Sequence, residues 1–337
     1  MTAPSSLKEY IFHHHLQGNR MEKDVEHLPD DCRQELERLT AILLQEFDEA
    51  MRGKQASHRK AGRILKLIAR LRPAVASDGL PALGSIHVLA VVNHRELADK
   101  DRHWHFAAAR LRQEQAMGLI CRSVQLDVYC LQDLNRELSD GVPYFTGIID
   151  EGVLLFELER TPLATPRKLM LGERCRRGHA EFSRWYPRAE DFLSGAQFYR
   201  AEGNLRMAAL LLHQTCEHLY QCMSWTFTLG GRRTHNLDEL RALAEDKNDD
   251  LRTIWPRTNR FEKRCFALIR RAYTDARYET TFTVAHDEIA WALSRVTMLF
   301  SRVGALCREH LSVLQSVSVA EQTPSFCNGH HERAAPS

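Results

Sequence analysis

The sequence predicts two domains of different class, a small α+β domain followed by an all-α antiparallel bundle. Two or three short apolar runs of strand length lie among helical patterns before residue 160, which is typical of a small mixed sheet with helices. From about residue 188 to residue 314 only helical patterns occur, joined by short connections. At 337 residues the chain is long enough for each domain to bury its own core.

The α+β domain is expected over residues 29–160, after a flexible tail at 1–28. Apolar residues at spacings of three and four predict an amphipathic helix over 30–51. Residues 57–71 are interpreted as a second helix that ends before Pro73. The remaining expected elements are strands at 86–93, 123–131 and 152–158 and a helix across 99–118.

Residues 161–187 are expected to be a linker, because the stretch after the last strand contains two prolines and no periodic pattern. Five helical patterns then fill 188–314, and short connections between them favour an antiparallel bundle. The polar segment 315–337 has no period and is expected to be a disordered tail.

The composition limits the class of protein. A formal net charge of +2 excludes a chain that binds nucleic acid as a uniform polycation, so any basic site must come from local clustering. We found no uncharged apolar run of the length of a membrane span, and no membrane partner is expected. The nine cysteines include no C-x-x-C pair and lie mostly in apolar helical patterns, which favours reduced thiols and a cytoplasmic protein.

Motifs in the second half follow a recognisable order. A helix carries the pair Phe198-Tyr199, a turn of small residues follows, and the next long helix has His and Glu on its apolar face. The sequence THNLDEL at 234–240 then begins a third helix, and LIRRAYTDARY at 268–278 lies in a fourth. This order resembles the HEPN domain family. The resemblance implies an all-α bundle, a homodimer formed through that bundle, and a link to toxin–antitoxin or defence systems.

Three segments of the first half also resemble a known family. They are SHRKAGRILKLI at 57–68, VLAVVNHREL at 88–97 and the long segment 124–157, which ends in GVLLFE. Together they resemble the minimal nucleotidyltransferases that are often fused to or paired with HEPN domains. In that family a Gly-Ser loop holds the triphosphate, and an Asp-x-Asp pair with a third carboxylate binds Mg²⁺.

The metal-binding pair of that family is absent at the matching positions. Aligned on the first core strand, the two Asp positions hold Ser85 and His87, while Asp127 remains at the third-carboxylate position. A hydroxyl and an imidazole are poor ligands for Mg²⁺. If Gly84-Ser85 is instead the phosphate loop, the next Asp-x-Asp is Asp99-Lys100-Asp101, which precedes a charged helix rather than entering a strand. Mg²⁺ and ATP are therefore expected as cofactors only if this site is functional, and no other metal site is expected.

The ribonuclease motif of the HEPN family is also incomplete. Active members carry Arg followed by His after four to six residues, where Arg stabilises the phosphate charge and His moves a proton. In this chain Asp275 stands five residues after Arg270, where the motif has His. A carboxylate at that place repels the scissile phosphate.

The better candidate for a ligand site is a basic stripe on the helix that begins near residue 257. Arginines recur there at spacings of three, four and seven, opposite an apolar side, and such a stripe can bind phosphate. The alternative is a solvated face paired with acidic neighbours. The candidate nucleotide- or phosphate-binding residues are Arg257, Arg260, Arg264, Arg270, Arg271, Arg277 and Tyr278.

Neither domain carries the complete catalytic motif of the family that it resembles, which favours binding or regulation over catalysis. The sequence thus predicts a non-catalytic nucleotide- or RNA-binding protein. One alternative is an enzyme, acting either by Mg²⁺-dependent nucleotidyl transfer to a protein or small molecule or by RNA cleavage at an atypical HEPN site. A third interpretation treats the bundle as a dimerisation module alone.

Overall fold

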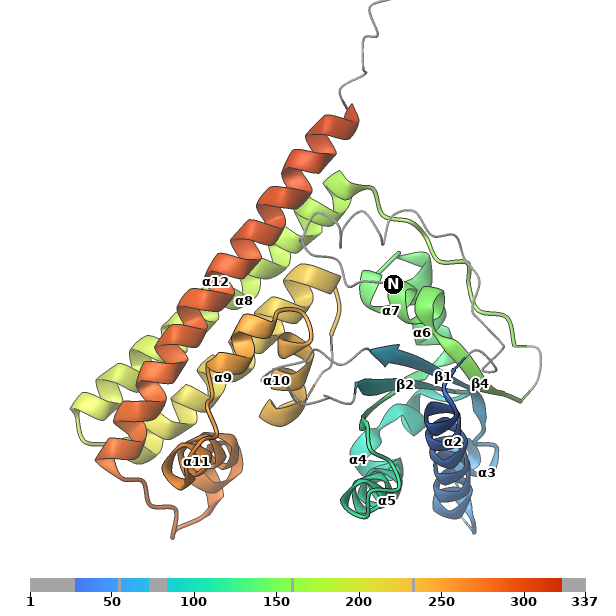
Figure 1. Ribbon diagram of the computed structural model, residues 1–337, viewed down its shortest axis with the longest axis horizontal. Coiled ribbons are helices and arrows are strands. Elements are labelled where there is room, and N and C mark those ends of the chain that lie inside the picture. Colours follow the sequence, from blue (N-terminus) through green and yellow to red (C-terminus); the bar gives the residue numbers. More distant parts are fainter. Residues whose placement is uncertain (1–27, 54–55, 73–83, 159–160, 232–233, 323–337) are drawn as a thin grey trace, which may run out of the picture.

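The computed structural model describes residues 28–53, 56–72, 84–158, 161–231 and 234–322. The predicted tail at 1–28 lies almost wholly outside these ranges, as does most of the predicted tail at 315–337. Within them the chain forms a sheet-containing N-terminal domain and a helical C-terminal domain (Figure 1), which confirms the predicted fold class.

The N-terminal domain contains a four-stranded mixed sheet in the order β3-β2-β1-β4. Its strands are β1 (Ile64–Arg72), β2 (Ser85–Val92), β3 (Ser123–Cys130) and β4 (Val153–Glu157). β1 is antiparallel to both β2 and β4, whereas β2 and β3 are parallel. Parallel neighbours need a crossover connection, which here contains α4 (Lys100–His103) and α5 (His105–Ala116).

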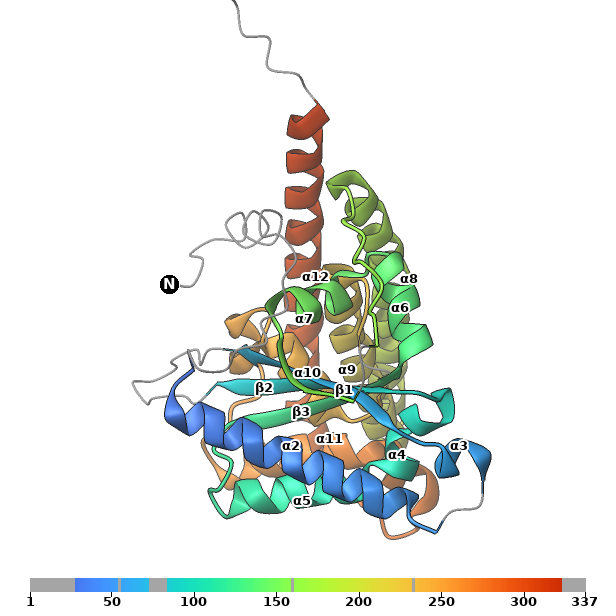
Figure 2. The ribbon, with the colours of Figure 1, turned by 90° about the vertical axis from the view of Figure 1, so that its right-hand side faces the viewer.

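Helices cover both faces of the sheet (Figure 2). On one face, α2 (Asp30–Met51) and α5 pack through residues such as Leu39 and Trp104. On the other, α6 (Leu131–Ser139) and α7 (Pro143–Glu151) pack on Ile68 and Leu89. Because both faces are covered, the central part of β2 is a continuous apolar run rather than an alternating one.

The predicted helix at 57–71 is wrong over most of its length. Only α3 (Ser57–Lys60) is helical, and the apolar run that follows is strand β1. A short apolar run has the same appearance in a buried helix and in a strand covered on both faces. Pairing with β2 and β4 on either side decides for the strand. The restriction that Pro73 places on the preceding residue also favours extended backbone.

The C-terminal domain contains five α-helices, as predicted, among the described residues. They are α8 (Leu171–Ala201), α9 (Leu205–Thr228), α10 (Leu237–Glu245), α11 (Arg260–Tyr278) and α12 (His286–Gln322). A short 3-10 helix, η2 (Asp249–Thr253), precedes α11. The long helices α8 and α12 run side by side (Figure 1), and α9 packs against both. Leu212, Leu219 and Leu299 are among the fully buried residues of this core.

Both predicted limits of the bundle are corrected. Helix α8 begins at Leu171 and runs through Pro187, so most of the predicted linker at 161–187 is helical. Helix α12 continues to Gln322, so the first part of the predicted tail at 315–337 is helical as well. Leu314 and Cys175 are buried together where α12 and α8 extend beyond the rest of the bundle. This mutual packing explains why both helices are longer than their local patterns predicted.

Helix α12 is the one described helix that is long and apolar enough to cross a membrane, judged by length and composition. Its residues Ile289, Val296 and Val303 are fully buried in the bundle core. A helix buried in the core of a bundle meets the same criteria, and these three residues of α12 pack in such a core.

Candidate functional site

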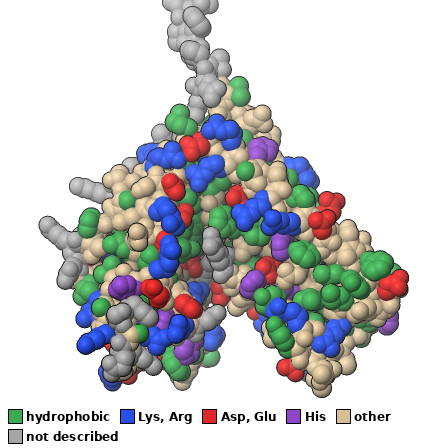
Figure 3. Space-filling model, turned by 180° about the vertical axis from the view of Figure 1, so that it is seen from behind, with side chains coloured by type: hydrophobic (Ala, Val, Ile, Leu, Met, Phe, Trp, Pro, Cys, Tyr) green, Lys and Arg blue, Asp and Glu red, His purple; other side chains and the backbone are tan. Residues whose placement is uncertain are grey.

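Two adjoining cavities lie between the domains. The first, of about 510 Å³, is lined by β3, α6 and α7 on one side and by the end of α9 on the other. The second, of about 800 Å³, is lined by residues 98–100 and by parts of α10 and α11. We call the two together the interdomain cleft. In the view from behind, the domains form two lobes separated by a notch (Figure 3).

The remnant of the nucleotidyltransferase-like site lies beside the first cavity. Asp127 of β3 lines that cavity and is buried, and Nε2 of His87 on β2 lies 2.7 Å from its Oδ2 atom. The hydroxyl of Tyr144 on α7 donates a second hydrogen bond to the same oxygen. Of the three residues predicted at this site, the structure therefore brings His87 and Asp127 together. The third, Ser85, is the first residue of β2, two positions before His87.

The side chains of Asp127, His87 and Tyr144 do not form a magnesium site. Mg²⁺ prefers carboxylate and phosphate oxygens in octahedral geometry, whereas the partners of Asp127 are an imidazole and a phenol. Across the ranges that the structure describes, no group of three or more His, Cys, Asp or Glu is placed to hold a metal ion. The alternative pair, Asp99 and Asp101, lies at the start of a helix, where Asp99 accepts a hydrogen bond from the backbone of Arg102.

The rest of the first cavity combines rings with paired charges. Tyr129 and Phe145 meet edge-on at 4.8 Å between ring centroids, and Trp225 lies on the opposite wall. At the rim, Nε of Arg95 donates to Oδ2 of Asp133 at 2.9 Å. This hydrogen bond from Arg95 lowers the pKa of Asp133 to about 2, so the carboxylate is ionised at neutral pH.

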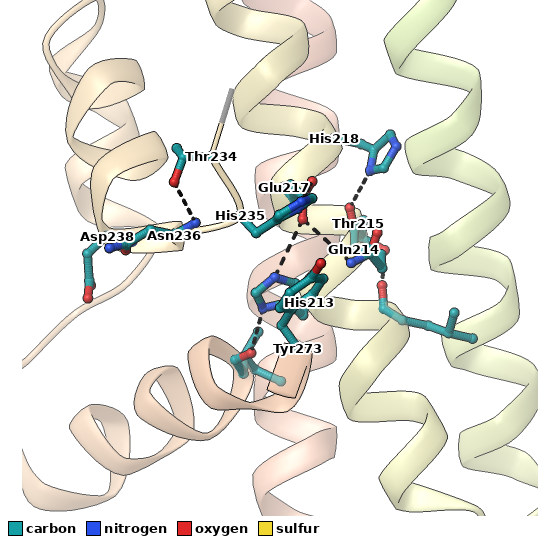
Figure 4. A network of polar contacts seen from close by, with 12 residues as sticks. His213, Gln214, Thr215, Glu217, His218, Thr234, His235, Asn236, Asp238 and Tyr273 are labelled. Atoms are coloured by element: carbon teal, nitrogen blue, oxygen red, sulfur yellow. Dashed lines mark hydrogen bonds and ion pairs between the residues drawn. The ribbon is translucent and has the colours of Figure 1, made fainter. Parts of the chain in front are cut away.

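The second cavity is bordered by a network of histidines around one carboxylate (Figure 4). His235 lies just before α10, and its Nδ1 atom is 2.9 Å from Oε1 of Glu217 on α9. His213, one turn earlier on α9, has Nε2 at 3.6 Å from the other oxygen of Glu217, while its Nδ1 lies 3.0 Å from the carbonyl oxygen of Ile269. The ring of Tyr273 stacks with both histidines, at 4.6 Å from His235 and 5.2 Å from His213.

Burial divides this network into a hidden part and an exposed part. Glu217 and His213 have side chains that are 9% and 1% exposed, whereas His235 is 61% exposed. Burial opposes the ionisation of Glu217, but hydrogen bonding to His213 and the charge of His235 outweigh it and lower the pKa of the carboxyl group. With Nδ1 held by Glu217, Nε2 is the nitrogen that His235 offers to the cavity. An imidazole oriented in this way by a carboxylate can act as a base or acid.

The predicted basic stripe does not converge on one place. Its seven members are all exposed, and Arg270 is the one that lines the cleft. Arg264 pairs with Glu288. Arg271 lies 3.6 Å from Asp275, the residue at the histidine position of the ribonuclease motif. For the remaining members, Arg257 lies over the ring of Phe266, Arg277 lies between Tyr273 and Tyr278, and Arg260 is exposed on the first turn of α11.

Sequence reasoning missed the cleft residues on the bundle side. The available signal was Glu217, a carboxylate on an otherwise apolar helix face, since a buried charge requires a partner. Lys100 gave no signal, because its position depends on how the two domains are placed against each other.

The helices of the C-terminal domain match a known family. Residues 182–306 match the model of the HEPN domain family. A crystal structure of a nucleotidyltransferase-like protein from Exiguobacterium sibiricum is similar over 86% of this chain and 81% of its own, with 15% sequence identity and a TM-score of 0.27. At that score the fold assignment rests on the strands and helices described above. None of the curated proteins searched matches this chain.

Proposed function

We propose that this HEPN-domain protein binds a nucleotide or single-stranded RNA in the interdomain cleft and that its N-terminal domain no longer transfers nucleotides. Residues 182–306 match the HEPN domain family, and the sheet-containing N-terminal domain holds the segments that resemble the minimal nucleotidyltransferases. Our proposal further places the chain in a toxin–antitoxin or defence system of the cytoplasm, as a homodimer formed through the bundle. The alternative of a purely structural dimerisation module leaves the cleft without a role.

The observation that carries the proposal is the combination of rings and cations in the cleft. Tyr129 and Trp225 can stack with a base, and Lys100 and Arg136 lie near enough to reach a phosphate. Several of the cations are held by carboxylates, as Arg270 is by Asp238. A phosphate has to displace these partners, so we expect moderate affinity with a clear dependence on salt.

The state of Asp127 supports the non-catalytic part of the proposal. Its carboxylate has a hydrogen-bonding histidine and tyrosine as partners, and β2 offers a hydroxyl and an imidazole where nucleotidyl transfer needs two further carboxylates.

The test compares two double variants of the full chain. Binding of a labelled single-stranded RNA and of labelled AMP is measured at low and at physiological salt. We expect Lys100→Ala/Arg136→Ala to weaken binding at least tenfold. Arg264→Ala/Arg271→Ala, on the exposed face of α11, should bind as the wild type does. The reverse pattern would move the site to the basic stripe.

Transfer activity has a separate test. The protein is incubated with labelled ATP and Mg²⁺, alone and with candidate protein acceptors, beside an Asp127→Ala variant. We expect no label to be incorporated by either protein. Incorporation that disappears in Asp127→Ala would overturn the non-catalytic part of the proposal.

A second candidate function, RNA cleavage, is favoured by the pairing of His235 with Glu217. Nε2 of His235 would take the proton of a ribose 2′-hydroxyl while the 2′-oxygen attacks phosphorus. The P–O5′ bond then breaks, and the proton passes from the imidazolium to the 5′-oxygen, which leaves a cyclic phosphate. Release of 2′,3′-cyclic phosphate ends from RNA, lost in His235→Ala, would establish this function in place of simple binding.

A further inference from the structure

The two cavities of the cleft share an edge. Ala98, Lys100 and Thr234 line both cavities, so Lys100 is the charged side chain at their junction. Volumes of about 510 and 800 Å³ each fall within the range of roughly 300–1,000 Å³ that is usual for sites of single small ligands. The cleft therefore consists of two compartments, each large enough for one nucleoside, with an ammonium group between them.

Each compartment offers a flat surface to a base. In the first, the partly exposed rings of Tyr129 and Trp225 form part of the wall. In the second, the exposed imidazole of His235 is backed by Tyr273 with their ring planes 14° apart. Stacking on such rings tolerates any base, because every base has a π-face.

The charges of the cleft disfavour a polyphosphate. Among the described residues that line the two cavities, four cationic side chains face six carboxylates. The cations are Arg95, Lys100, Arg136 and Arg270, and the carboxylates are Asp99, Asp127, Asp133, Glu137, Asp238 and Glu239. A triphosphate would bring several negative charges to this acidic lining, whereas a phosphodiester brings one. Carboxylates also accept hydrogen bonds from ribose hydroxyls.

The cation at the junction is held by an exchangeable partner. Nζ of Lys100 on α4 lies 3.8 Å from Oε2 of Glu239 on α10, and the two side chains are 35% and 32% exposed. An ion pair with this exposure is weak. A phosphate entering between the cavities can take the place of Glu239, and the long side chain of Lys100 needs to move little to follow it.

We propose that the ligand is a unit of two nucleosides joined by one phosphodiester, with a nucleoside in each cavity and the joining phosphate on Lys100. The inference rests on the proposed nucleotide- or RNA-binding function and names the substrate class of that same cleft. Glu239 then competes with the phosphate for Lys100 and limits the affinity.

The experiment measures the affinity of the full chain for AMP, ATP, the dinucleotide ApA and a six-residue oligoadenylate. We expect ApA to bind at least tenfold more tightly than AMP or ATP, which corresponds to about 1.4 kcal/mol. Lys100→Ala should lose this preference, because the joining phosphate of ApA then meets no ammonium group at the junction. Glu239→Gln should tighten ApA binding several-fold. Arg102→Ala, on the same short helix but outside the lining of both cavities, is the matched control and should behave as the wild type does.

The outcomes separate this inference from the proposed function. If AMP and ApA bind equally, if ATP binds most tightly, or if Glu239→Gln weakens ApA binding, the two-compartment inference is wrong while nucleotide binding stands. If none of the four ligands binds, the proposed function fails as well. When ApA binds with the expected preference, equal affinity for the oligoadenylate identifies a free dinucleotide as the fitting size. Tighter binding of the longer oligonucleotide identifies RNA as the source.

Discussion

Nε2 of His87 lies 2.7 Å from Oδ2 of Asp127, and this contact joins two neighbouring parallel strands across the buried centre of the N-terminal domain. The side chains of both residues are less than 5% exposed. A position that the resemblance assigns to a metal-binding carboxylate thus holds a side chain that satisfies the remaining carboxylate. The carboxylate of Asp127 is thus hydrogen-bonded within the protein.

We predict that His87→Ala destabilises the protein by about 3 kcal/mol, because breaking a buried polar pair leaves the charge of Asp127 less well satisfied. Tyr144→Phe, which removes one hydrogen bond to the same carboxylate, should cost about 1 kcal/mol. The free energy of unfolding is measured by urea denaturation. The matched control is His94→Ala at an exposed position, expected to fall within about 0.5 kcal/mol of the wild type. Equal effects at positions 87 and 94 would contradict the importance of the pair.

The contact between α8 and α12 depends on Gly304. A Cβ atom at that position would lie 2.3 Å from Oη of Tyr186, whose hydroxyl donates to the carbonyl oxygen of Phe300. We predict that Gly304→Ala lowers the free energy of unfolding by about 1–3 kcal/mol, despite the better helix propensity of alanine. Gly147→Ala is the control, since a Cβ there meets one nitrogen of Arg70 at 3.5 Å. Thermal melting that shows the same shift for both variants would refute the close packing.

His310 should make the protein sensitive to acid. Its ring is fully buried and stacks on Phe227 at 4.0 Å, and neither nitrogen has a hydrogen-bond partner among the described residues. Burial, together with the charges of Arg174 and Lys247, lowers the pKa of His310 from 6.5 to about 3. The unfolded chain therefore binds a proton at this residue that the folded chain does not, at every pH between these values.

This difference in proton binding lowers the stability of the folded protein in acid. The contribution of His310 is constant above about pH 6.5, and stability is lost progressively as the pH falls from there toward 3. We predict that His310→Phe, which retains a ring against Phe227, flattens the pH dependence of the unfolding free energy in this window. His286→Phe, at the start of the same helix, serves as an exposed control. An unchanged slope in His310→Phe would show that other groups cause the loss of stability in acid.

Much of the fold could be predicted from the sequence, because it depends on local patterns. The strand at β2 and the helices α2, α9 and α11 follow directly from apolar runs and periodicity. β1 could not be recognised in this way, because its pattern also fits a helix and only pairing with β2 and β4 makes it a strand. Pro162 and Pro166 made the segment after β4 look like a linker up to residue 187, yet helix α8 begins at Leu171 and packs against the long helix α12.

Some residues of the candidate site could likewise be predicted from the sequence, and others could not. His87 and Asp127 were identifiable, because they lie in the segments that resemble the minimal nucleotidyltransferases, and the structure places them on adjacent strands. The pairing of Lys100 with Glu239 depends on the placement of one domain against the other, and no local pattern encodes it. The basic stripe was visible in the sequence, but Glu288, which neutralises Arg264, belongs to a different helix.

The histidine network permits a final prediction that separates structure from function. His213 is buried and hydrogen-bonded to the backbone of α11, so we expect His213→Ala to cost about 2–3 kcal/mol of stability. His235 is mostly exposed, and His235→Ala should cost less than about 1 kcal/mol. Denaturation measures both. If ApA is bound or RNA is cleaved at this wall of the cleft, that activity should fall in the stable variant His235→Ala. A destabilised His235→Ala with unchanged ligand binding would show that both histidines serve the bundle alone.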